Sequence, residues 1–124
     1  MKHFTLAELG ATDVKDFHPN FLDRLVELRI QVGMRFFVNS CARSEQHNEK
    51  IGGSAKSLHI FDKPKRDNQK GCAAIDIRTT SRAFKVELVK TALLTGWSVG
   101  IYKTFTHLDR RIDLGEQQTI FKGK

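Results

Sequence analysis

The chain has 124 residues, of which 40% are hydrophobic and 28% charged, and lysine and arginine exceed aspartate and glutamate by seven. This composition is typical of a globular domain, and we expect a single domain over residues 1–124. No apolar run is long enough to span a membrane, and the N-terminal charge is not followed by the apolar stretch of a secretory signal. We therefore expect a protein made in the cytoplasm, without a membrane span.

The excess of positive charge indicates an anionic partner, either nucleic acid or the bacterial cell wall. The basic residues are scattered, apart from Lys63-Pro64-Lys65-Arg66 and Arg110-Arg111. The chain has neither a recognition-helix pattern nor an aromatic-rich RNA motif, so we do not expect a nucleic-acid partner.

The N-terminal third predicts two helices. Thr5 can cap a short helix that ends at Gly10, and Pro19 suits the first turn of a longer helix that ends at Gly33. The longer helix carries apolar residues at helical spacing on one face: Phe21, Leu25, Leu28 and Val32. This face is expected to pack on the core.

The middle of the chain predicts a strand over residues 35–40, which is rich in aromatic and β-branched side chains. Ser44 can cap a short helix that Gly52-Gly53 closes. Two cysteines, Cys41 and Cys72, follow no metal-binding spacing, and we expect buried, reduced thiols.

The second half predicts strands and one helix, in this order: a strand at 73–77, a helix at 82–95 capped by Ser81, strands at 97–102 and 105–109 joined by a hairpin, and an edge strand at 119–121. The helix has a broad apolar face: Phe84, Val86, Leu88, Val89, Ala92 and Leu93. Together these elements predict the α+β class, with a small antiparallel sheet and helices packed on it.

Three side chains from separate elements form a predicted zinc site. His59 precedes a polar loop over residues 62–70, Asp76 lies on the strand that follows this loop, and His107 lies on a later strand. The loop cannot bury an apolar face, so we expect it on the surface. Two imidazoles and one carboxylate are the ligands of a catalytic zinc, which keeps its fourth position open.

An ordered series of short motifs surrounds these residues: Cys41-Ala42-Arg43-Ser44, His47-Asn48, Gly52-Gly53-Ser54, Ser57-Leu58-His59, Asp76 and His107-Leu108-Asp109. The series resembles the pattern of the zinc D-alanyl-D-alanine carboxypeptidase and L-alanyl-D-glutamate endopeptidase superfamily, which includes phage endolysins. The resemblance runs from about residue 3 to residue 112. It implies a zinc-dependent cell-wall peptidase with the fold of the Hedgehog signalling domain.

The sequence departs from this pattern between the first two expected ligands. Asp76 lies 17 residues after His59, where the family usually has seven, and Cys72 stands where the family has a glycine. We interpret the difference as an insertion in the loop between the ligands. Asp76 is favoured because a strand holds it, while Asp62 and Asp67 in the inserted loop stay open as substitutes.

The resemblance also implies roles around the metal. Arg43 corresponds to a substrate-pocket arginine, and a fixed guanidinium binds a peptide carboxylate bidentately, although a solvated surface arginine is the alternative. Ser57 is expected to bond the peptide or the ligand shell, and Tyr102 to donate to the oxyanion. His47 is a further candidate for a fourth metal ligand, but the histidine at this position of the family pattern is not a ligand, and a structural role is expected.

The general base is the least defined of these roles. Several family members place an acidic residue three positions before the last ligand, where this chain has Thr104. Strand alternation puts Asp109 on the same face as His107, which makes Asp109 the predicted catalytic base. Its alternative roles are to orient His107 or to bind Arg43. Other carboxylates that stay open as the base are Asp62, Asp67 and Glu116.

We therefore expect a monomeric zinc peptidase that cuts peptidoglycan stem peptides, either a phage-type lysin released to the cell wall after synthesis or an enzyme carried in a phage particle. The bond itself stays open between L-Ala–D-Glu, D-Ala–diaminopimelate and D-Ala–D-Ala. The alternative is a non-catalytic or weakly catalytic protein on the same fold, which binds the cell wall or forms part of a virion or tail.

Overall fold

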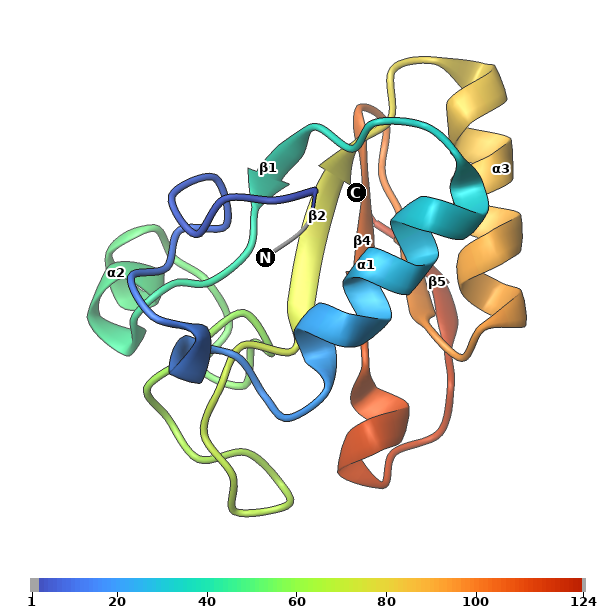
Figure 1. Cartoon of the computed structure of the whole chain (residues 1–124). Coiled ribbons are helices and arrows are strands. Elements are labelled where there is room, and N and C mark those ends of the chain that lie inside the picture. Colours follow the sequence, from blue (N-terminus) through green and yellow to red (C-terminus); the bar gives the residue numbers. More distant parts are fainter. Residues whose placement is uncertain (1–2, 124) are drawn as a thin grey trace.

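The computed structural model describes residues 3–123 and is organised around a five-stranded sheet with the order β1-β2-β4-β3-β5 (Figure 1). The strands are β1 (Val38–Ser40), β2 (Ala74–Arg78), β3 (Ser98–Ile101), β4 (Phe105–Asp109) and β5 (Ile120–Lys122). The first four strands of this order pair antiparallel, and β5 runs parallel to β3. The predicted α+β class is confirmed, and β5 makes the sheet mixed.

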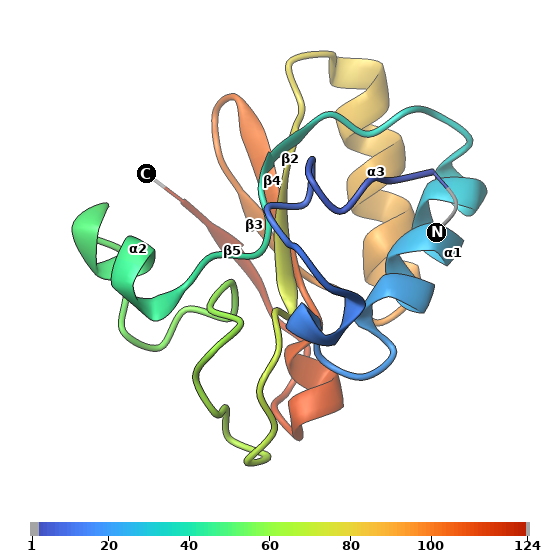
Figure 2. The same ribbon diagram turned by 60° about the vertical axis from the view of Figure 1, so that its left-hand side comes forward.

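Helices cover one face of the sheet. Helices α1 (Phe21–Val32) and α3 (Arg82–Leu94) pack together on this face, whereas α2 (Glu45–Lys50) and the loop after it lie on the other side (Figure 2). Two short 3-10 helices complete the fold. The first, η1 (Val14–Asp16), precedes α1, and the second, η2 (Arg111–Leu114), lies between β4 and β5. The arrangement leaves the face opposite α1 and α3 free to carry functional side chains.

The predicted apolar face of α1 is confirmed, since Phe21, Leu25, Leu28 and Val32 are all buried. Gly33 ends the helix in the left-handed conformation that glycine adopts without strain. Burial of each large apolar side chain stabilises the fold by about 1.5–3 kcal/mol, which fixes α1 against the sheet.

Serine caps set the other two helices, as predicted. The Ser44 hydroxyl accepts a hydrogen bond from the His47 amide at the start of α2, and the Ser81 hydroxyl accepts one from the Phe84 amide at the start of α3. Each cap satisfies a backbone N–H that has no partner within its helix.

Some predicted details differ. Val86 was expected on the buried face of α3 but is 55% exposed, because it lies two residues, about 200°, around the helix from buried Phe84 and Leu88. Residues 6–10 form turns rather than a helix, although Thr5 and Glu8 still form reciprocal capping bonds. The first strand begins at Val38 instead of Arg35.

Candidate metal and substrate site

Strand alternation divides β2 and β4 between the core and the site. Ile75, Ile77 and Leu108 are fully buried in the core that the helices cover. Asp76 pairs directly with His107 across the two strands, so both side chains point to the opposite face. The neighbouring position on β3 is Gly100, where a Cβ would collide with the Phe121 ring that lies beside His107.

His59 approaches this pair from the loop after α2. Its backbone carbonyl accepts from the Arg43 amide at 3.1 Å, and the Leu58 carbonyl accepts from the Ala73 amide at 2.8 Å. The His59 Nδ1–H donates to the Cys41 carbonyl at 2.7 Å, and a carbonyl can only accept. In the neutral imidazole that a metal requires, Nε2 therefore carries the lone pair, and it lies 3.3 Å from Asp76 Oδ1.

The structure brings His59, Asp76 and His107 together, with one ligand atom from each within 4.8 Å of the others. All three side chains are buried or partly buried. Two imidazole nitrogens and one carboxylate oxygen suit zinc and leave a position open for a further ligand. The residues present therefore fit a catalytic zinc.

His107 lies between two carboxylates. Its Nδ1 is 3.0 Å from Asp76 Oδ1, and its Nε2 is 2.8 Å from Asp109 Oδ2. Burial lowers the pKa of His107, but the bonds to Asp109 and Asp76 outweigh it and raise the pKa to about 9. Burial alone would raise the pKa of Asp76, yet the bonds from His107 and His59 hold it well below its usual range. Metal binding at Nδ1 requires that nitrogen to lose its proton, while Nε2–H can stay on Asp109.

Asp109 is held from two sides. One side is His107, and the other is the Arg111 guanidinium, which reaches both carboxylate oxygens at 2.9 and 2.7 Å. The Asp109 side chain is only 1% exposed. Burial would raise its pKa, but the bonds from His107 and Arg111 lower the pKa to about 2. These contacts match the predicted alternative in which Asp109 orients His107, with Arg111 in place of Arg43 as its cationic partner.

Arg43 is fixed by three hydrogen bonds. Its Nε donates to Asn48 Oδ1 at 2.8 Å, and its two terminal nitrogens donate to the hydroxyls of Ser40 and Ser57 at 3.1 and 3.3 Å. An arginine has five N–H donors, so two are left for a ligand. Arg43 is thus a positioned side chain at the site and not a freely solvated one.

A cavity of about 290 Å³ opens over these groups. It is lined by the three metal-binding candidates and by the predicted substrate residues Arg43, Ser57 and Tyr102, with Asp109 and Arg111 at its wall. The Ser57 hydroxyl also accepts from the His59 amide at 3.2 Å, which links the loop that bears His59 to Arg43. Tyr102 stacks on Phe105 with the ring centroids 4.3 Å apart.

The inserted loop leaves the site geometry intact because its ends meet. The Gly71 amide donates to the Phe61 carbonyl at 3.0 Å, so residues 62–70 form a closed excursion. Asp62 accepts from the Glu45 amide, and Asp67 pairs with His18 at 2.6 Å. Neither carboxylate lines the metal cavity, and Glu116 and the exposed His47 do not line it either.

Sequence reasoning missed two residues that organise the site. Asn48 is buried; its Oδ1 holds Arg43, and its Nδ2 donates to the Ser54 carbonyl at 2.9 Å. Gly53 is required beside it, because a Cβ there would collide with the Asn48 carboxamide. The other residue is Arg111, the first residue of η2, which strand alternation along β4 could not indicate because β4 ends at Asp109.

Both cysteines are buried and free, as predicted, with their sulfurs 3.8 Å apart. Burial and the neighbouring Cys72 thiol raise the pKa of Cys41 well above its usual value. The Cys41 backbone carbonyl, and not its thiol, serves the site by holding His59.

The fold and site define a small α+β protein with a His–Asp–His group that can hold a metal ion. The family model described as Peptidase M15 matches residues 2–109, and the chain belongs to this family of metallopeptidases. No curated protein and no solved structure matches the chain. Within residues 3–123, no helix has the length and apolar character needed to cross a bilayer.

Proposed function

We propose that this protein is a zinc peptidase that hydrolyses peptide bonds in the stem peptides of bacterial peptidoglycan, as a phage-type lysin does. The observation that carries the proposal is the convergence of His59, Asp76 and His107 in one cavity that Arg43 also lines. A metal group alone supports hydrolysis of many substrates. The neighbouring arginine adds a preference for a peptide that carries a carboxylate.

Zinc at His59 Nε2, Asp76 and His107 Nδ1 would supply a Lewis acid that polarises the scissile carbonyl and makes bound water more acidic. The chain contributes the orientation of these ligands. The Cys41 carbonyl selects the His59 tautomer, and Asp109 does the same for His107.

Arg43 is the proposed carboxylate clamp. Its bonds to Asn48, Ser40 and Ser57 hold the guanidinium in one orientation before the substrate arrives. A preorganised donor loses less conformational entropy on binding than a free side chain does. Ser57 and Tyr102 line the same cavity and are proposed to contact the peptide.

A general-base role for Asp109 stays a prediction. Asp109 is the carboxylate other than Asp76 that lines the metal cavity among residues 3–123. Its low pKa and its bonds to Arg111 make it a weak base and favour the positioning role. The proposal of a peptidase does not depend on which role Asp109 performs.

The proposed partner is peptidoglycan, which is anionic and therefore complements the net charge of +7. We also propose that the protein acts as a monomer, and that it reaches the wall after release from the cell or within a phage particle. The competing function, wall binding without catalysis, makes the opposite prediction in the experiment that follows.

The test is zymography on purified murein with and without a chelator, followed by mass spectrometry of the products. We expect cleared zones that disappear with the chelator and return with added zinc. The masses of the products identify which of the three stem-peptide bonds is cut. Binding to murein without any cleavage, at full zinc occupancy, would replace the peptidase with a wall-binding protein.

A further inference from the structure

A second cavity of about 230 Å³ lies beside the metal cavity. The two cavities share three wall residues, Lys56, Ser57 and Leu58, which makes them neighbours. The remaining wall comes from the inserted loop and from the segment at residues 114–116. The insertion that separates His59 from Asp76 in sequence therefore builds a surface next to the site.

The wall of this second cavity is strongly basic. Four cationic residues line it against a single carboxylate, Glu116: Lys56, Lys63, Lys65 and Arg66. Apolar side chains form the rest, among them Leu58 and Leu114. Such a wall suits an anionic group that is carried on a short aliphatic chain.

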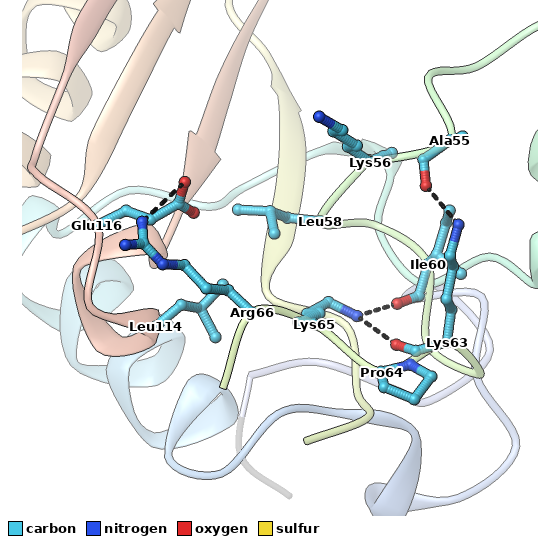
Figure 3. A pocket seen from close by; sticks show the side chains of 11 residues that line it. Ala55, Lys56, Leu58, Ile60, Lys63, Pro64, Lys65, Arg66, Leu114 and Glu116 are labelled. Carbon is cyan, nitrogen blue, oxygen red and sulfur yellow. Dashed lines mark hydrogen bonds and ion pairs between the residues drawn. The ribbon is translucent and has the colours of Figure 1, made fainter. Parts of the chain in front are cut away.

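Two of the four cations are used within the protein (Figure 3). The Lys65 ammonium donates to the Ile60 and Lys63 carbonyls, and the Lys63 ammonium donates to the Ala55 carbonyl and pairs with Glu45. These bonds shape the loop and leave little capacity for a ligand.

The other two cations are available. The Lys56 ammonium makes no hydrogen bond or ion pair with residues 3–123, and in Figure 3 it points away from Lys63 and Lys65. Arg66 is 67% exposed and is only loosely paired with Glu116, at 3.9 Å. An exposed pair at this distance is weak, so an incoming anion can replace it at little cost.

We propose that this second cavity is a carboxylate subsite, in which Lys56 and Arg66 bind a second acidic group of the same stem peptide whose first carboxylate meets Arg43. The proposal rests on the proposed function, because stem peptides carry free carboxylates on both D-Glu and diaminopimelate. The methylene groups of these residues suit Leu58 and Leu114. Ser57 bonds Arg43 and lines both cavities, so the proposed subsite lies next to the Arg43 clamp.

The test is isothermal titration of the full chain, loaded with zinc, with two synthetic peptides. One is L-Ala–γ-D-Glu–diaminopimelate–D-Ala with its L-Ala–D-Glu amide reduced to a secondary amine, so that the zinc-loaded protein cannot hydrolyse it. The other is the same peptide with the free α-carboxyl of D-Glu and the side-chain carboxyl of diaminopimelate amidated. The wild type should bind the free acid more tightly. The double variant Lys56→Gln/Arg66→Gln should lose roughly tenfold in affinity for the free acid, and its remaining preference for the free acid, which Arg43 supplies, should be smaller by the same factor.

The matched control is Lys50→Gln/Lys70→Gln. It removes the same charge from exposed positions, one of them in the inserted loop, and neither residue lines the cavity. This control should retain the preference for the free acid, and zinc content should be equal in all three proteins. An equal loss of affinity in the control would mean that the loss comes from the lower net charge of the protein, and this result would overturn the subsite.

The outcomes separate this inference from the peptidase itself. A wild type that cleaves murein but binds both peptides equally overturns the subsite and leaves the peptidase standing. A wild type that fails to cleave murein but binds the free acid through Lys56 and Arg66 overturns the peptidase and supports the subsite. Failure to bind either peptide overturns the subsite.

Discussion

The site is built from two regions that are held in different ways. Asp76 and His107 lie on paired strands, where the ladder of β2 and β4 sets their separation. His59, Ser57 and Lys56 lie on a loop that is held by single bonds, such as the bond from His59 to the Cys41 carbonyl. Two of the three candidate ligands therefore rest on the sheet, and the loop that follows His59 can lengthen without moving them.

The loop over residues 62–70 illustrates this difference. It separates His59 from Asp76 along the chain, yet it closes on itself between Phe61 and Gly71. Closing a longer loop costs little additional free energy, so the fold tolerates residues 62–70 at this point. Their side chains instead reach the second cavity, where they can change which substrate is recognised without changing the metal ligands.

The largest expected effect comes from removing a ligand on the sheet. His107→Ala should abolish zinc binding in elemental analysis of the dialysed protein, because two ligands hold the metal far less tightly than three. His59→Ala should do the same from the loop side. His47→Ala is the matched control, since this exposed histidine lies outside the group. Full zinc occupancy in His107→Ala would remove the assigned site.

A smaller effect is expected from a change in Asp109, the carboxylate that bonds the ligand His107. Asp109→Asn keeps the shape of the side chain but weakens its hold on His107, so zinc affinity should fall about 10- to 100-fold. Competition with a chromogenic chelator measures this affinity. Asp113→Asn is the control, because it breaks a similar pair with Arg110 outside the site.

The same variant distinguishes the two roles of Asp109. A general base predicts unchanged zinc affinity and a turnover number lower by roughly 10²–10⁴ at saturating zinc. That combination would return Asp109 to the catalytic role and leave His107 to be oriented by the strand alone.

The third prediction concerns substrate binding without loss of metal. Arg43→Ala should keep its zinc and raise KM on stem peptides roughly tenfold, the usual worth of a hydrogen bond to a charged group. Arg24→Ala removes an exposed arginine of α1 and should behave as the wild type does. If Arg43→Ala also has an unchanged KM, the guanidinium does not contact substrate.

The smallest effect is expected from the anchor of the inserted loop. Burial would raise the pKa of Asp67, but the bond to His18 and the Gln69 amide lower it below its ordinary value. A lowered pKa stabilises the fold above the ordinary pKa, and this stabilisation is lost as the pH falls through the folded value. Asp67→Asn should therefore lower the free energy of unfolding by about 0.5–1 kcal/mol at pH 7, and the difference should shrink as the pH falls below the ordinary pKa of aspartate.

Urea unfolding of the metal-free protein at pH 7 and at about pH 3 measures this difference. Glu49→Gln, which changes an exposed carboxylate of α2, is the control and should have no effect at either pH. A loss that is equal at both pH values would mean that Asp67 acts through its shape and not its charge. Zinc affinity should be unchanged in Asp67→Asn, because the anchor lies outside the sheet-borne site.

Features that depend on neighbours along the chain could be predicted from the amino-acid sequence. Serine caps, the apolar stripe of α1 and the alternation along β4 are set within a few residues, so Ser44, Ser81 and the shared face of His107 and Asp109 were predictable. The expected metal ligands were predicted from the order of the short motifs. Asp76 was chosen in addition because it lies on a predicted strand that holds its side chain.

Features that depend on contacts between distant segments became visible in the folded protein. No local pattern shows that the inserted loop closes on itself, that β5 runs parallel to β3, or that Asn48 holds Arg43. Val86 was misjudged because the direction of a helical face is settled by what packs against it. Such contacts arise from burial and pairing across the whole fold, so no local repeat or spacing in the sequence predicts them.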